Sequence, residues 1–102
     1  MNNKESFKNN YFNLRREKMI EVKGAYSNAV QYFKELVGDF ECDLEEIELS
    51  PNYKYWRVTL SYYEKKPSTD SMAPILVLKK SAKTITVDSE DGTFFSMKIA
   101  RL

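Results

Sequence analysis

The spacing of hydrophobic and polar residues changes along the chain from a helical rhythm to a strand-like alternation. Over residues 19–37, apolar residues recur every three or four positions, which is the spacing of one helix face. The pattern predicts a helix over residues 27–37. The helix begins either at an N-cap formed by Ser27 or further upstream, where Gly24 weakens the pattern. Gly38 is suited to end it.

The rest of the chain favours strands. The predicted strands span residues 44–49, 53–63, 75–78, 84–87 and 93–100. A polar loop is expected over residues 64–74, and the basic stretch 79–83 interrupts the apolar pattern. A tight turn over residues 89–92 should use Gly92 at positive φ.

Two strands alternate clearly enough to predict which side chains point inward. In the strand 53–63 the inward row is Trp56, Val58, Leu60 and Tyr62. The opposite row, facing water or a partner, is Tyr55, Arg57, Thr59, Ser61 and Tyr63. In the last strand, Phe95, Met97 and Ile99 should point inward, and Phe94, Ser96 and Lys98 outward.

These elements predict an α+β fold. One main N-terminal helix should pack on one face of a three- to four-stranded antiparallel sheet, leaving the other face open. Residues 19–102 are expected to form this single domain. Residues 1–18 are polar and rich in asparagine, which indicates a flexible N-terminal arm or a segment that orders on a partner.

About three-quarters of the chain resembles a group of small uncharacterised bacterial proteins related to the PepSY-type domain. The segments that carry the resemblance are 25–33, 44–50, 55–62 and 85–99, with the pattern Tyr-Trp-x-Val-x-Leu followed by Val-Asp-x-x-x-Gly. The resemblance implies a helix followed by a β-meander and a non-catalytic module with an inhibitory or regulatory role. The chain carries a long insertion over residues 64–83, and we expect no signal segment, so it departs from the usual setting of this group.

Charge is unevenly distributed along these 102 residues although the formal net charge is only +1. Residues 25–49 contain seven acidic residues and one basic residue, whereas residues 1–24 and 50–102 have net charges of +3 and +4. The basic excess is too small to favour nucleic acid as a partner. No segment is long and apolar enough to span a membrane, and the single Cys42 suits a reducing compartment, so we expect a cytoplasmic protein.

The chain contains no histidine, which excludes Ser-His and Cys-His pairs and His-ligated zinc. Cys42 lies between Glu41 and Asp43, which should disfavour its thiolate. The remaining enzyme hypothesis, carboxylates acting with a tyrosine, would need a cleft that the sequence does not indicate. We therefore expect a non-enzymatic protein without a cofactor or metal.

Two acidic segments have ordinary structural explanations. The stretch 88–92 lacks the ligand spacing of a calcium loop and fits a hairpin turn. The second segment could bind a cation or a basic partner, but it also fits a solvated edge or face of the sheet. Its acidic residues are Glu41, Asp43, Glu45, Glu46 and Glu48.

The outward aromatic and basic residues form the candidate partner-binding face: Tyr55, Arg57, Tyr63, Phe94 and Lys98. Such a face suits a protein interface, with a partner or with a second copy, or it stacks the bases of single-stranded nucleic acid. An ordinary solvated surface, or one covered by the N-terminal arm, is the alternative. The leading hypothesis is a protein-binding or self-associating module.

Overall fold

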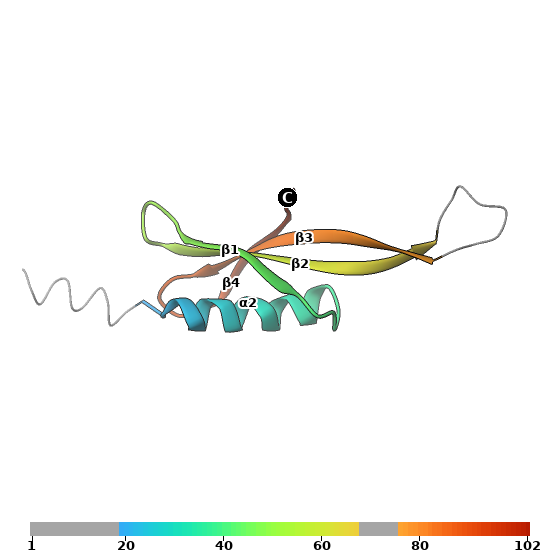
Figure 1. Ribbon diagram of the computed structural model, residues 1–102. Helices are drawn as coiled ribbons and strands as arrows, with labels where there is room; N and C mark the ends of the chain where they lie inside the picture. The colour runs from blue at the N-terminus through green and yellow to red at the C-terminus, as the bar shows by residue number, and fades with distance from the viewer. Residues whose placement is uncertain (1–18, 68–75) are drawn as a thin grey trace, which may run out of the picture.

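The computed structural model describes residues 19–67 and 76–102, and Figure 1 shows one helix lying along a single sheet. In chain order the elements are α2 (Val22–Leu36), β1 (Asp43–Leu49), β2 (Tyr55–Pro67), β3 (Leu76–Asp88) and β4 (Phe94–Ile99). The strands lie side by side in the same order, each antiparallel to the next. The predicted α+β arrangement is therefore confirmed. The predicted N-terminal arm lies outside the described residues, as does part of the predicted loop 64–74.

Helix α2 begins at Val22, so its upstream turns form and Ser27 lies inside the helix rather than at its N-cap. The residue that precedes α2 makes no side-chain cap hydrogen bond. Instead, the backbone of Ile20 is held by the β3–β4 turn and by β2. Its N–H donates to the carbonyl of Ser89 at 2.7 Å, and its carbonyl accepts from Trp56 Nε1 at 3.2 Å. Tertiary hydrogen bonds thus take the place of a local cap.

The end of α2 follows the prediction. The backbone N–H groups of Val37 and Gly38 both donate to the carbonyl of Phe33, at 2.8 and 3.4 Å. Gly38 has a φ of 143°, which a residue with a side chain rarely adopts. Glycine at this position therefore lets the chain leave the helix and turn toward β1.

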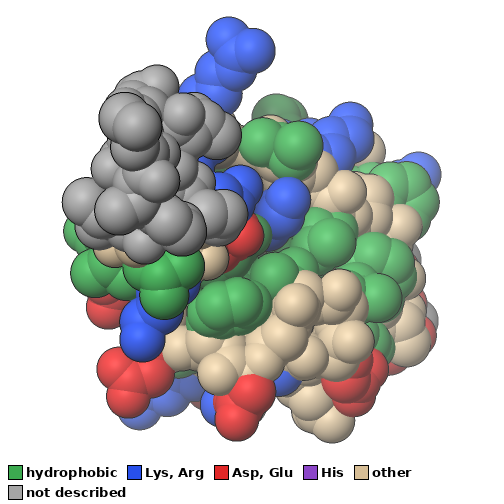
Figure 2. Space-filling model, turned by 90° about the vertical axis from the view of Figure 1, so that its right-hand side faces the viewer, with side chains coloured by type: hydrophobic (Ala, Val, Ile, Leu, Met, Phe, Trp, Pro, Cys, Tyr) green, Lys and Arg blue, Asp and Glu red, His purple; other side chains and the backbone are tan. Residues whose placement is uncertain are grey.

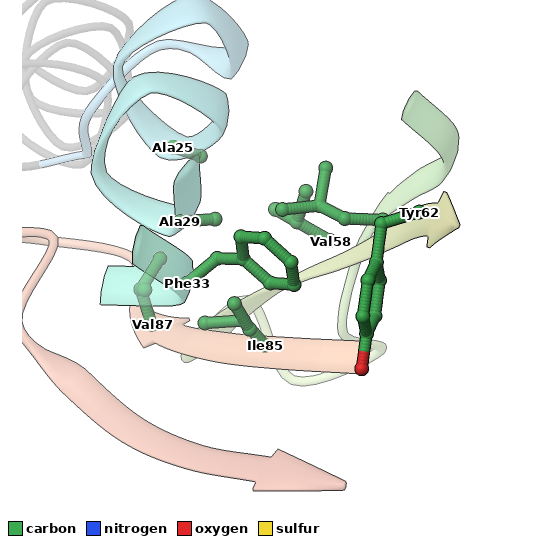
Figure 3. Close-up of a cluster of buried hydrophobic side chains, with 8 residues drawn as sticks. Ala25, Ala29, Phe33, Val58, Tyr62, Ile85 and Val87 are labelled. Carbon is green, nitrogen blue, oxygen red and sulfur yellow. The ribbon is translucent and has the colours of Figure 1, made fainter. Parts of the chain in front are cut away.

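The core lies between α2 and one face of the sheet (Figure 3). Its buried members are Ala25, Ala29, Phe33, Val58, Leu60, Tyr62, Ile85 and Val87. Figure 3 shows the Phe33 ring pointing from the helix toward the strands, and it meets the Tyr62 ring edge-on at 4.9 Å. Trp56 is partly buried against this cluster, so the inward row predicted for β2 is confirmed.

The predicted loop 64–74 is wrong in part, because β2 and β3 continue pairing far beyond the helix (Figure 1). β1 reaches only as far as Ser61, and β4 only as far as Lys83. We call residues 62–67 and 76–81, which pair with each other beyond those limits, the extension. The basic stretch 79–83 lies inside β3 and does not interrupt it.

The turn between β3 and β4 is a tight hairpin turn, as predicted. Gly92 has a φ of 74°, and its N–H donates to the carbonyl of Asp88 at 2.9 Å. The Asp88 carboxylate accepts the N–H of Glu90 at 2.8 Å. Gly92 also approaches the helix, where Asn28 Nδ2 donates to its carbonyl at 3.1 Å. The turn is thereby joined to α2.

Candidate functional site

The sheet face opposite α2, which we call the outer face, holds four of the five predicted partner-binding residues. Tyr55, Arg57 and Tyr63 alternate with the buried row of β2, and Lys98 lies opposite Thr84 of β3. Thr84 in turn shares a hydrogen bond with Thr59 across this face at 2.8 Å. The register therefore brings these four side chains to the same side of the sheet.

The fifth residue, Phe94, is on the other side, which corrects the prediction for the last strand. β4 contains a register shift: Ser96 lies opposite Thr86, but Phe94 lies opposite Val87, leaving Phe95 as the extra residue of a bulge. Phe94 consequently sits on the helix side, where its ring centroid is 5.4 Å from that of Tyr32. Met97 and Ile99 keep their predicted side, because the strand alternates regularly after the bulge.

Phe95 occupies the place on the outer face that Phe94 was expected to fill. Its ring centroid is 4.5 Å from that of Tyr55, and the rings are tilted by 39°. Phe95 remains 59% exposed in this pair, although aromatic side chains are usually covered. A shallow hollow of about 380 Å³ beside the pair is lined by Tyr55, the β1–β2 turn and the β3–β4 turn. The aromatic pair is thus the apolar centre of the outer face.

The outer face carries charged side chains of both signs, and these form ion pairs with one another. Arg57 Nη1 lies 3.6 Å from Glu48 Oε1. Glu45 Oε2 accepts the Ser61 hydroxyl at 2.7 Å and lies 3.7 Å from Lys80 Nζ. The Ser61 hydrogen bond is the main reason why the pKa of Glu45 is lowered. Because acidic and basic groups alternate here, the outer face lacks the continuous positive charge that a phosphate backbone needs.

The extension adds exposed aliphatic side chains that the sequence pattern did not reveal. Leu76, Val77 and Leu78 return to the sheet as expected, as the first residues of β3, and they are 66%, 45% and 65% exposed there. Tyr63 is 52% exposed and lies on the outer face of the same extension. Figure 2, which faces the end of the molecule where the extension lies, shows hydrophobic side chains at the surface beside lysine and arginine.

Cys42 lies in a hollow of about 600 Å³ between α2 and the segment that leads into β1. Burial raises the pKa of its thiol, Lys34 lowers it, and Asp43 raises it further. A raised pKa disfavours the reactive thiolate, in agreement with the expectation from its acidic neighbours. The hollow therefore lacks an activated nucleophile.

The acidic residue Asp91 forms hydrogen bonds within the β3–β4 turn itself. The Asp91 carboxylate accepts the backbone N–H and the hydroxyl of Thr93, at 2.9 and 2.8 Å, and these bonds lower its pKa. Across residues 19–67 and 76–102, no group of three or more metal-binding side chains is found. Within the same residues, no helix has the length and apolar character needed to cross a membrane.

Among the described residues, the outer face and the extension therefore both carry exposed apolar side chains, Phe95 on the first and Leu76 to Leu78 on the second. Comparison of the chain with protein-family models, curated proteins and solved structures gives no match. The PepSY-like resemblance thus stays a prediction from the sequence motif.

Proposed function

We propose that this chain is a small non-enzymatic protein-binding or self-associating module with a regulatory or inhibitory role, and that it binds through the outer face. The observation that carries the proposal is the Tyr55–Phe95 pair, in which Phe95 is exposed and Tyr55 is half-buried. An aromatic centre surrounded by paired charges is the composition of a protein interface, in which a few aromatic residues supply most of the binding energy.

The chemistry of the side chains supports the same proposal. The sequence has no histidine, and the pKa of its single cysteine is raised. A catalytic role would therefore fall to carboxylates or tyrosines. The described carboxylates with altered pKa values, Glu45 and Asp91, bond to hydroxyl or backbone groups beside them, and their pKa values are lowered. A general acid or base at neutral pH needs a pKa moved toward 7, which is the opposite direction for a carboxyl group.

Single-stranded nucleic acid is the alternative occupant of the outer face. Tyr55, Phe95 and Arg57 suit base stacking and phosphate contact. However, Glu46 and Glu48 lie on this same face, and Glu48 already pairs with Arg57. The local repulsion of phosphate by these carboxylates favours a protein partner.

Substitutions on the two faces of the sheet test the proposal. Phe95→Ser and Tyr55→Ser should abolish an association that wild type makes, either with itself in light scattering or with a species retained from cell extract. Ile99→Ser is the matched control, because Ile99 is 79% exposed in the same strand but lies on the helix side. Its association should equal that of wild type.

Two outcomes would count against the outer face as a protein-binding surface. One is a monomeric wild type that retains nothing beyond what Phe95→Ser retains. The other is salt-sensitive binding of mixed single-stranded oligonucleotides that Arg57→Ala weakens, which would give the function to the alternative.

A further inference from the structure

The sheet edge formed by β1 has a step. β1 pairs with β2 from Leu49 opposite Trp56 to Asp43 opposite Ser61. β2 then continues to Pro67 with β3 on one side and, among the described residues, no strand on the other. The outer edge of β1 and the free edge of β2 in the extension therefore lie end to end on the same side of the sheet. Within residues 19–67 and 76–102 neither edge pairs with a further strand, so both present backbone groups that another strand could bind.

This step is complementary to itself. A half-turn about an axis perpendicular to the sheet, placed at the step, brings the extension of one copy alongside β1 of the other. The same contact then forms twice, as in an isologous dimer. Because β1 and β2 are antiparallel within a copy, β1 would run parallel to β2 of the second copy. We propose that two copies of this chain join their sheets through this stepped edge.

The charges on the two parts of the edge are opposite. β1 carries Asp43, Glu45, Glu46 and Glu48 and no basic residue. The extension carries four lysines and one glutamate: Lys65, Lys66, Lys79, Lys80 and Glu64. A second copy therefore meets an acidic strand with a basic one, and opposite charges on adjacent strands attract.

Glu46 and Lys65 are the residues best placed to pair between copies. Both are exposed, and both lie on the outer face, because Glu46 is opposite Thr59 and Lys65 follows Tyr63 by two positions in β2. Within the described part of one copy, neither takes part in an ion pair. The half-turn keeps the outer faces of both copies on the same side, so these side chains would meet on it.

The extension itself has a physical reason to take a third strand. Two-stranded hairpins are marginal in water, and a third strand or a covering helix is usually needed for stability. Here the aliphatic side chains of Leu76, Val77 and Leu78 are exposed and lie on both faces of the extension. In the proposed dimer the extension gains β1 of the second copy as its third strand, and Leu44, which is 44% exposed, would be covered at the same contact.

A charge exchange between Glu46 and Lys65 tests this dimer by sedimentation equilibrium at low salt. Glu46→Lys and Lys65→Glu should each raise the dissociation constant about tenfold or more, since each places like charges together at both contacts. The double variant should return to within a few-fold of wild type. Glu90→Lys and Lys23→Glu are matched controls at exposed positions away from this edge, in the β3–β4 turn and in α2, and should dimerise as wild type does. Circular dichroism checks that each variant is folded.

The test separates this dimer from the outer-face proposal, on which it does not depend. A wild type that stays monomeric at millimolar concentration overturns the stepped-edge dimer, as does a dimer that tolerates both single charge reversals. A dimer broken by Phe95→Ser but not by Glu46→Lys would overturn it in favour of the outer face. The stepped-edge dimer would also be overturned if Lys65→Glu abolished binding to oligonucleotides but left the dissociation constant of the dimer unchanged.

Discussion

At the scale of single residues, the two glycines Gly24 and Gly92 illustrate how differently one residue type is used. A Cβ added at Gly24 would meet Ile20 Cβ at 3.7 Å, which is ordinary contact, and the residue has helical backbone. A Cβ at Gly92 would collide with the Asn28 side-chain amide, and its φ of 74° is strained for any residue with a side chain. The first glycine is replaceable, and the second is required by the turn.

Replacing these two glycines by alanine, one at a time, should therefore change the stability of the protein in opposite directions. Gly92→Ala should lower the free energy of unfolding by about 2 kcal/mol, because the left-handed conformation costs an alanine about 1 kcal/mol and the Asn28 bond is lost as well. Gly24→Ala should raise it by about 0.5 to 1 kcal/mol through helix propensity. Urea unfolding of both variants measures these effects. Equal stability of the two variants would contradict the close approach of the turn to α2.

At the scale of secondary-structure elements, the bulge in β4 and the extension are where sequence patterns lose their information. Alternation locates the buried row of β2 because one of its faces is covered by α2. It fails at Phe94 and Phe95, because two adjacent phenylalanines fit either register and a bulge leaves no mark in the sequence. It fails again in the extension beyond Tyr62, where exposed side chains lie on both faces and polarity need not alternate.

The same limits of the sequence pattern explain which residues of the candidate site could be predicted and which could not. Tyr55, Arg57, Tyr63 and Lys98 were predictable, because regular pairing sends them to the outer face. Phe95 could have been considered as the alternative to Phe94 from their adjacency alone. The stepped edge was beyond prediction, since it depends on how far each strand pairs with its neighbour.

Hydrogen exchange should show that the backbone amides in the two halves of β2 are protected to different degrees. In the monomer, backbone amides of residues 62–67 should exchange faster than those of Val58 and Leu60, which lie between two strands and beneath the helix. In the proposed dimer, extension amides on the edge should become slower to exchange, while those of Val58 and Leu60 change little. Equal protection along β2 at the lowest concentration would contradict the marginal stability of the extension.

At the scale of the whole molecule, the distribution of charge between regions is more informative than the net charge. The net charge of +1 combines an acidic strand β1 with a basic extension, and these regions lie end to end along one edge. Overall charge therefore says little about what this molecule binds. Local charge decides which surfaces attract one another, and salt should weaken such contacts.

The absence of histidine also determines how stability responds to pH. Hydrogen bonds lower the pKa values of Glu45 and Asp91 from ordinary values of 4.5 and 3.8. Burial is the main cause of the raised pKa values of Cys42 and Tyr62, from ordinary values of 9.0 and 10.0. A lowered pKa contributes stability above the unfolded-state pKa, and that contribution is lost as pH falls through the folded-state value. A raised pKa contributes stability that is lost as pH rises through the folded-state value.

Stability should therefore form a plateau between about pH 5.5 and 8, with a decline on each side. Urea midpoints measured across this range would locate the plateau, and Asp91→Asn should reduce the decline on the acid side. Tyr62→Phe should do the same on the alkaline side, since it removes a group that ionises more readily when unfolded. A transition near pH 6 to 7 would contradict this account, because no side chain of ordinary pKa titrates there in a chain without histidine.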